Sequence, residues 1–243
     1  SELIWDEDMS AEGFQAKYSF CPADNVSSWA QVEYMLIMES FAPDFASSWE
    51  SGDTTDAIAV QIGSTIDMDN GMDLTLAASY FCMDDVTSLP SWTARTNSVD
   101  GDWIVSDFDL YEFAGELGFV VDEMPCSIFA DYARNQDDRA GGQDTAWKVG
   151  LRVGEVKQKG DWSAQYDYSY VERDAILALL GNDDRGWSNY RGHGFRVDYG
   201  LLTNTTLTGK LYCLDVVHNG DSAFGESIHD TYIKGQIELA VKF

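Results

Sequence analysis

Two aspartates, Asp131 and Asp167, come closest to a catalytic pair, because paired carboxylates can serve as the acid and the base or nucleophile of glycoside hydrolysis. The residues around each alternate between polar and apolar, however, and this pattern favours solvated carboxylates on one face of a strand. The three histidines, His193, His218 and His229, match no zinc-protease spacing, and the four cysteines form no CxxC pair. We therefore expect that the protein is not an enzyme.

One stretch, Asp67-Met-Asp69-Asn-Gly71-Met-Asp73, resembles the start of a calcium-binding loop. The loop motif requires a distal glutamate, and position 78 is alanine. A tight hairpin turn explains the Asp, Asn and Gly residues equally well. We expect no resident metal and no cofactor, with calcium held only loosely by acidic loops such as those containing Asp137-Asp138 and Asp183-Asp184.

The chain is strongly acidic, with a formal net charge of −27 and a sequence pI of about 4.1. Such a chain repels phosphate backbones, which argues against a nucleic-acid partner and favours cations. A solvated acidic surface, or adaptation to salty surroundings, explains the charge about as well as a role in binding does.

Period-two alternation of polar and apolar residues recurs along the whole sequence and predicts an all-β fold. In Tyr232 to Phe243, for example, Ile233, Ile237 and Leu239 share one face of the predicted strand, while Lys234 and Glu238 share the other. Counted in this way, the chain has about eleven strands, with a twelfth near Leu3 to Asp6.

The connections between these strands come in two alternating kinds. Five are tight turns: 22–26, 69–71, 121–124, 157–160 and 202–204. Five are longer, polar and acidic: 41–55, 84–105, 136–144, 172–191 and 216–228. Strict alternation of short and long connections is typical of a transmembrane antiparallel up-and-down β-barrel and is not required in a Greek-key sandwich.

A bilayer explains which face of such a sheet points outward. Backbone groups in lipid must be paired within the protein, so the sheet closes, its apolar face meets lipid and its polar face meets water. Aromatic residues near strand ends, such as Phe20, Tyr80, Trp147 and Trp162, fit interfacial girdles, although ordinary core aromatics would look the same. The sequence therefore predicts outer-membrane lipid as a partner.

Several short motifs also resemble the bacterial "putative porin" family of outer-membrane β-barrels. They are Glu116-Leu-Gly-Phe119, Phe129-Ala-Asp-Tyr132, Lys159-Gly-Asp-Trp162, the run from Tyr168 to Ala175, Gly192-His-Gly-Phe195, Leu3-Ile-Trp-Asp6, Glu12-Gly13 and Lys17-Tyr-Ser-Phe20. The resemblance implies a single porin-like barrel domain over residues 1–243 in the outer membrane of a Gram-negative bacterium. The terminal Phe243 resembles the signal that barrel-assembly machinery reads, and analogy with general porins suggests a homotrimer.

Members of that family are usually longer, with further strands before the Ile4-Trp5 segment. Either about 12 strands close here, or N-terminal sequence is missing and the complete barrel has more, for example about 16. We expect an N-terminal truncation.

The polar faces of the predicted strands supply the expected pore lining, in which carboxylates outnumber cations. These residues are Glu33, Asp73, Glu112, Glu116, Asp131, Lys148, Arg152, Asp167, Arg196, Asp198, Lys210 and Glu238. In the loop from Glu172 to Arg191, the run Asp174 to Leu180 reads as a short helix ended by Gly181. If this loop folds inward, Asp183, Asp184 and Arg185 form a constriction; the alternative is a helix on the rim.

The function expected from these features is passive diffusion of small hydrophilic solutes and ions through an acidic lumen, with a mild preference for cations. Two alternatives stay open: a soluble, secreted all-β module that binds carbohydrate or another ligand, and a structural barrel without conductance. The soluble module requires the apolar strand faces to pack against each other, away from solvent.

Overall fold

The computed structural model describes residues 3–5, 12–38, 54–68, 70–218 and 231–242, and almost all of its regular structure is β. The strands are β1 (Glu12–Ala23), β2 (Val26–Met38), β3 (Thr55–Met68), β4 (Met72–Asp84), β5 (Val99–Asp100), β6 (Trp103–Ile104), β7 (Phe108–Val121), β8 (Met124–Asn135), β9 (Thr145–Gly154), β10 (Trp162–Val171), β11 (Tyr190–Leu202), β12 (Thr205–Val216) and β13 (Tyr232–Val241). Four single-turn 3-10 helices lie in the connections: η1 (Val86–Ser88), η2 (Ser91–Thr93), η3 (Asp138–Ala140) and η4 (Asp183–Arg185). No helix in the described ranges has the length and apolar character needed to cross a membrane.

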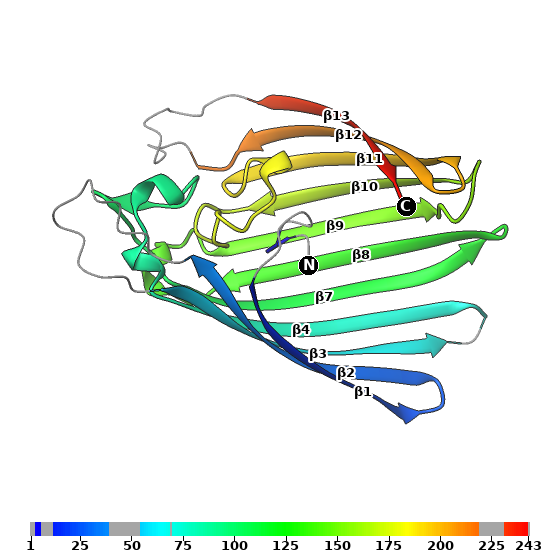
Figure 1. The fold of residues 1–243 in the computed structure, drawn as a ribbon, viewed down its shortest axis with the longest axis horizontal. Coiled ribbons are helices and arrows are strands. Elements are labelled where there is room, and N and C mark those ends of the chain that lie inside the picture. The colour runs from blue at the N-terminus through cyan, green and yellow to red at the C-terminus, as the bar shows by residue number, and fades with distance from the viewer. Residues whose placement is uncertain (1–2, 6–11, 39–53, 69, 219–230, 243) are drawn as a thin grey trace.

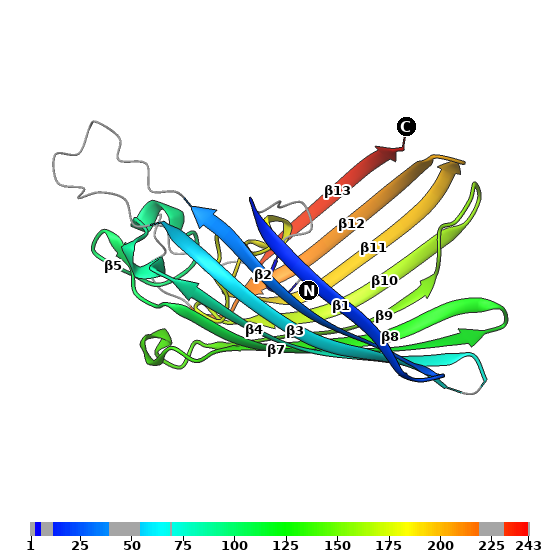
Figure 2. The same cartoon turned by 60° about the horizontal axis from the view of Figure 1, so that its bottom comes forward.

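Eleven of the strands form one sheet in which each strand pairs antiparallel with its neighbour in the chain (Figure 1). The order β1-β2-β3-β4-β7-β8-β9-β10-β11-β12-β13 is interrupted only by the small β5-β6 hairpin, so the predicted up-and-down fold is confirmed. The sheet curls into a trough and is not closed, with β1 and β13 as its two edges (Figure 2).

The tight turns form where the sequence offers residues that tolerate a left-handed backbone. Asn70 and Gly71 have φ values of 70° and 74° between β3 and β4, and Asp122 and Glu123 have 49° and 68° between β7 and β8. Val121 pairs with Met124, so Asp122 and Glu123 form the two-residue hairpin turn whose twist matches that of the strands. Met68 pairs with Met72, so the β3–β4 connection is one residue longer; Asn70 and Gly71 act as turn residues in it, and Asp69 lies outside the described residues.

Two sequence predictions about secondary structure are wrong. Leu3 to Trp5 form a turn and not a strand, and Leu3 and Ile4 are buried, with 2% and 1% of their surface exposed. Asp174 to Leu180 form successive turns instead of a helix, because the Asn97 side chain donates to the Ile176 carbonyl and accepts from the Ala178 N–H. Tertiary hydrogen bonds have replaced the local helical ones.

The two faces of the sheet differ in chemistry as the alternation predicts. Large apolar side chains point away from the trough and remain exposed in the middle of the sheet, including Ile62 at 59%, Phe113 at 55% and Val197 at 52%. The opposite face carries polar and charged residues over its central part. Exposure of a continuous apolar face is unusual for a soluble protein and is expected of a surface that contacts lipid.

The buried apolar core lies on the inner face, near the ends of the strands that carry the long connections. Residues 85–107 and 172–189 fold over this end and pack against inward-facing residues such as Met83, Leu110 and Leu214. These two connections therefore turn into the trough (Figure 2).

Candidate functional site

All twelve residues expected to line a pore lie on the inner face of the sheet. Residues that are paired across antiparallel strands share a face, and the register connects the twelve positions through successive pairs. Across β2 to β8 the predicted lining residues are all acidic. The four cations, Lys148, Arg152, Arg196 and Lys210, all lie on β9 to β12.

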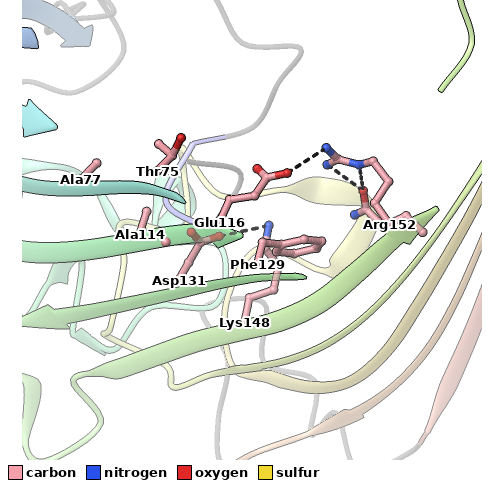
Figure 3. A pocket seen from close by; sticks show the side chains of 10 residues that line it. Thr75, Ala77, Ala114, Glu116, Phe129, Asp131, Lys148 and Arg152 are labelled. Atoms are coloured by element: carbon pink, nitrogen blue, oxygen red, sulfur yellow. Dashed lines mark hydrogen bonds and ion pairs between the residues drawn. The ribbon is translucent and has the colours of Figure 1, made fainter. Parts of the chain in front are cut away.

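A hollow of about 250 Å³ lies where the acidic and basic halves meet (Figure 3). Glu116 and Asp131, from β7 and β8, form one side, and Lys148 and Arg152, both from β9, form the other. The Arg152 Nη1 lies 3.8 Å from Glu116 Oε1, and the Lys148 Nζ lies 3.6 Å from Asp131 Oδ2. Both separations exceed those of a short charge-assisted hydrogen bond.

The floor of the hollow is the aromatic ring of Phe129. The Lys148 Nζ and the Arg152 Cζ lie 5.6 and 5.7 Å from its centroid, within range of cation–π attraction. Gly150 makes this arrangement feasible, since a Cβ at that position would come within 2.4 Å of the Phe129 ring. Arg152 is steadied from the other side by two hydrogen bonds to Gln165 Oε1, at 3.0 and 3.1 Å.

A second cluster holds the tip of the β10–β11 connection against the inner face. Arg185, in η4, makes a two-pronged ion pair with Asp167 of β10, at 2.6 and 2.8 Å, and both side chains are buried. The guanidinium also lies over the Tyr212 ring, 4.9 Å from its centroid. Gly194 leaves room for the pair, because a Cβ there would lie 2.8 Å from Asp167 Oδ2. The tip therefore turns inward and does not form a helix on the rim.

The neighbouring carboxylate, Asp184, connects the same tip to β12 and β13. It accepts hydrogen bonds from Lys234 Nζ at 2.9 Å and Gln236 Nε2 at 2.5 Å, and Lys210 Nζ lies 3.5 Å away. Burial raises the pKa of Asp184, but the bonds from Lys234 and Gln236 outweigh burial, and the net pKa is below its ordinary value. Charged Asp184 therefore stabilises the inward position of the tip.

Acidification is expected to weaken this attachment only at low pH. Because the pKa of Asp184 is lowered, its contribution is present above its unfolded pKa, about 3.9, and is lost as the pH falls through the still lower folded value. The groups facing Asp184 are Lys210, Lys234 and Gln236, and the two lysines stay protonated throughout. The difference in free energy of unfolding between the unaltered protein and Asp184→Asn, measured with urea in detergent, should stay constant from pH 7 to 5 and shrink below about pH 4. Asp184→Asn should be the less stable at neutral pH; equal stability there would contradict the assignment.

Residues that the sequence analysis did not identify connect the two long connections to each other. Asn97 donates to the carbonyls of Arg173 and Ile176 at 2.7 and 2.9 Å, and Asp174 accepts from the Ser98 N–H and hydroxyl at 2.8 and 2.5 Å. Burial raises the pKa of Asp174 and outweighs the opposing bonds from Ser98. Protonation of Asp174 therefore removes the free-energy cost of burying its charge, whereas protonation of Asp184 weakens its hydrogen bonds to Lys234 and Gln236.

The other predicted residues are dispersed over the inner face. Glu33 accepts hydrogen bonds from Gln15 and Gln31, and Arg196 and Asp198 pair with each other at 3.0 Å. Lys210 also pairs with Glu238 at 2.8 Å. In the described ranges, no group of three or more His, Cys, Asp or Glu side chains is arranged to hold a metal, and all four cysteines are free. Phe243 and His229 lie outside the described residues.

Comparison with known proteins gives a family match over more than half of the chain. A family model described as "Putative porin" matches residues 110–243. Among solved structures, the chain is similar to LpxR from Salmonella typhimurium, with a TM-score of 0.35 and 9% sequence identity over 95% of this chain and 88% of that one. A likeness at this level says nothing about activity. No match was found among curated proteins.

Proposed function

The chain belongs to the "Putative porin" family, and from this premise we propose that it forms a water-filled channel in the outer membrane of a Gram-negative bacterium, through which small hydrophilic solutes and ions diffuse. The family supports a porin-like role and an outer-membrane β-barrel. In this proposal outer-membrane lipid surrounds the sheet and the barrel-assembly machinery inserts it. The proposed assembly is a homotrimer. The acidic loops would bind calcium loosely.

One observation carries the proposal: the sheet is apolar on its outer face and charged on its inner face. The outer side chains of the central strands are exposed, as those of Ile62, Phe113 and Val197 show, and no second sheet of the described residues packs against them. A soluble ligand-binding module requires the opposite arrangement, with its apolar face covered. A sheet with this two-sided character is stable when lipid covers one face and water the other.

The charges on the inner face support a mild preference for cations. Eight of the twelve proposed lining residues are carboxylates and four are cations. None of the four cations lies on β2 to β8, which carry five of the carboxylates. Rings and strips of charged side chains set ion selectivity in channels by raising the local concentration of the opposite ion. The basic half on β9 to β12 moderates this preference.

The selectivity can be measured on the purified protein in planar bilayers. In a tenfold gradient of potassium chloride, the zero-current potential should have the sign of cation preference. The triple variant Glu33→Gln, Asp73→Asn, Glu116→Gln should move it toward anions, whereas Glu155→Gln, in the turn between β9 and β10, should leave it unchanged. Anion preference in the unaltered channel would contradict the selectivity, and an absence of conductance would favour a structural barrel.

A further inference from the structure

We propose that the hollow between β7 and β9 binds small zwitterionic solutes, meaning molecules that carry an ammonium and a carboxylate close together, as α-amino acids do. This inference rests on the proposed channel function for its biological meaning, but the binding itself depends only on the local geometry. The proposal names the class of solute that binds in this hollow of the inner face.

The charges of the hollow are arranged in two opposed pairs. Glu116 faces Arg152, and one row farther along the strands Asp131 faces Lys148, so that both carboxylates lie on one side and both cations on the other (Figure 3). A solute with a single charge would be attracted by one side and repelled by the other. A zwitterion can place its ammonium toward the carboxylates and its carboxylate toward the cations at the same time.

The distances between the protein charges suit such a ligand. The pairs are separated by 3.6 and 3.8 Å, a spacing similar to that between the two charged groups of an α-amino acid. Both pairs are ion pairs; the Asp131 and Lys148 side chains are only 11% and 6% exposed, whereas the Glu116 and Arg152 side chains are 42% and 45% exposed. The charged ends of the outer pair are therefore accessible from the lumen.

The surroundings hold the charged groups apart and leave space beside them. Arg152 is fixed by Gln165 and by the Phe129 ring, so its guanidinium cannot fold freely onto Glu116. Thr75, Ala77 and Ala114 line the side nearest to Glu116 with small side chains. A bidentate guanidinium is well suited to a carboxylate, and a carboxylate pair to an ammonium.

The test measures binding of glycine to the purified, detergent-solubilised protein by calorimetry, with acetate and methylammonium as probes of each charge alone. Glycine should bind, and each single-charge probe should bind at least tenfold more weakly, because it engages one side and is repelled by the other. Glu116→Gln and Arg152→Gln should each weaken glycine binding at least tenfold. The charge swap Glu116→Arg with Arg152→Glu should restore it, with the solute reversed.

Two controls make the result decisive. Glu155→Gln removes a carboxylate outside the hollow and should leave glycine affinity unchanged. Heat-modifiable migration on gels should show that every variant is folded. Glycine binding that is absent, that survives both single substitutions, or that acetate matches would overturn the proposal. In planar bilayers, glycine should also reduce the ion current. Conductance without glycine binding would contradict this inference but not the channel function. Glycine binding without conductance would contradict the channel function but not this inference.

Discussion

Asp167→Asn is expected to destabilise the protein by about 3 to 5 kcal/mol and to increase its conductance. The substitution removes the carboxylate that pairs with Arg185, whose side chain is only 8% exposed, and leaves the guanidinium buried without its counter-charge. The neutral amide can accept one hydrogen bond but cannot offset that charge. Since Arg185 anchors the tip of the β10–β11 connection, its release should widen the space beside β10 to β13.

Urea unfolding in detergent micelles and single-channel recording would measure the two effects. The matched control is Asp198→Asn: its partner Arg196 is 35% exposed, and the amide oxygen can still accept from Ser163 or Thr208, so the loss should be about 1 kcal/mol. Replacing both partners, as in Asp167→Leu with Arg185→Met, should cost less than Asp167→Asn alone, because no buried charge is left. Equal losses at Asp167 and Asp198 would show that the tip is not held by this ion pair.

Leu76→Arg is expected to cost about 2 to 4 kcal/mol, because it places a charge on the face of β4 that meets the interior of the bilayer. Leu76 lies in the middle of this strand and is 51% exposed on the outer face. In water an exposed leucine is replaced by arginine at little cost, so a large loss would itself report a lipid environment.

The adjacent residue gives a matched control. Thr75 lies on the inner face, where its hydroxyl bonds that of Thr65 at 2.8 Å, and Thr75→Arg should cost less than about 1 kcal/mol. Folding in lipid vesicles, followed by intrinsic tryptophan fluorescence, would measure both variants. If Thr75→Arg were the more harmful of the two, the inward and outward faces would have been assigned the wrong way round.

The strands and their faces could be predicted from the sequence because a half-exposed strand shows its period of two directly. The final strand, for instance, was expected over Tyr232 to Phe243 and is found over Tyr232–Val241. The inner-face position of residues as distant as Glu33 and Glu238 follows from the same alternation. Family membership and the up-and-down order agree with this expectation.

The contacts within the site could not be predicted, because they depend on register and on long-range folding of the connections. Alternation places Glu116 and Arg152 on one face, but only the pairing of β7, β8 and β9 brings them within 3.8 Å. The helix expected near Ala178 is absent because Asn97, a distant residue, supplies its hydrogen bonds.

One signal in the sequence could have revealed the inward folding of the connections. Near the long connections the inward-facing positions of the strands become apolar, as at Phe81 and Met83 on β4 and at Phe108 and Leu110 on β7. Apolar side chains that face inward need a cover that keeps them from water.

The directions of the two edge strands, β1 and β13, constrain how the sheet could close into a barrel. β1 and β13 both run from the end with the long connections toward the end with the tight turns. If they bonded directly to each other, they would form a parallel seam, with slanted hydrogen bonds, in a sheet whose other neighbours are all antiparallel. A seam made only of antiparallel bonds requires an odd number of intervening strands. Cysteine pairs placed across the two edges would therefore report whether β1 and β13 bond directly to each other or are separated by further strands.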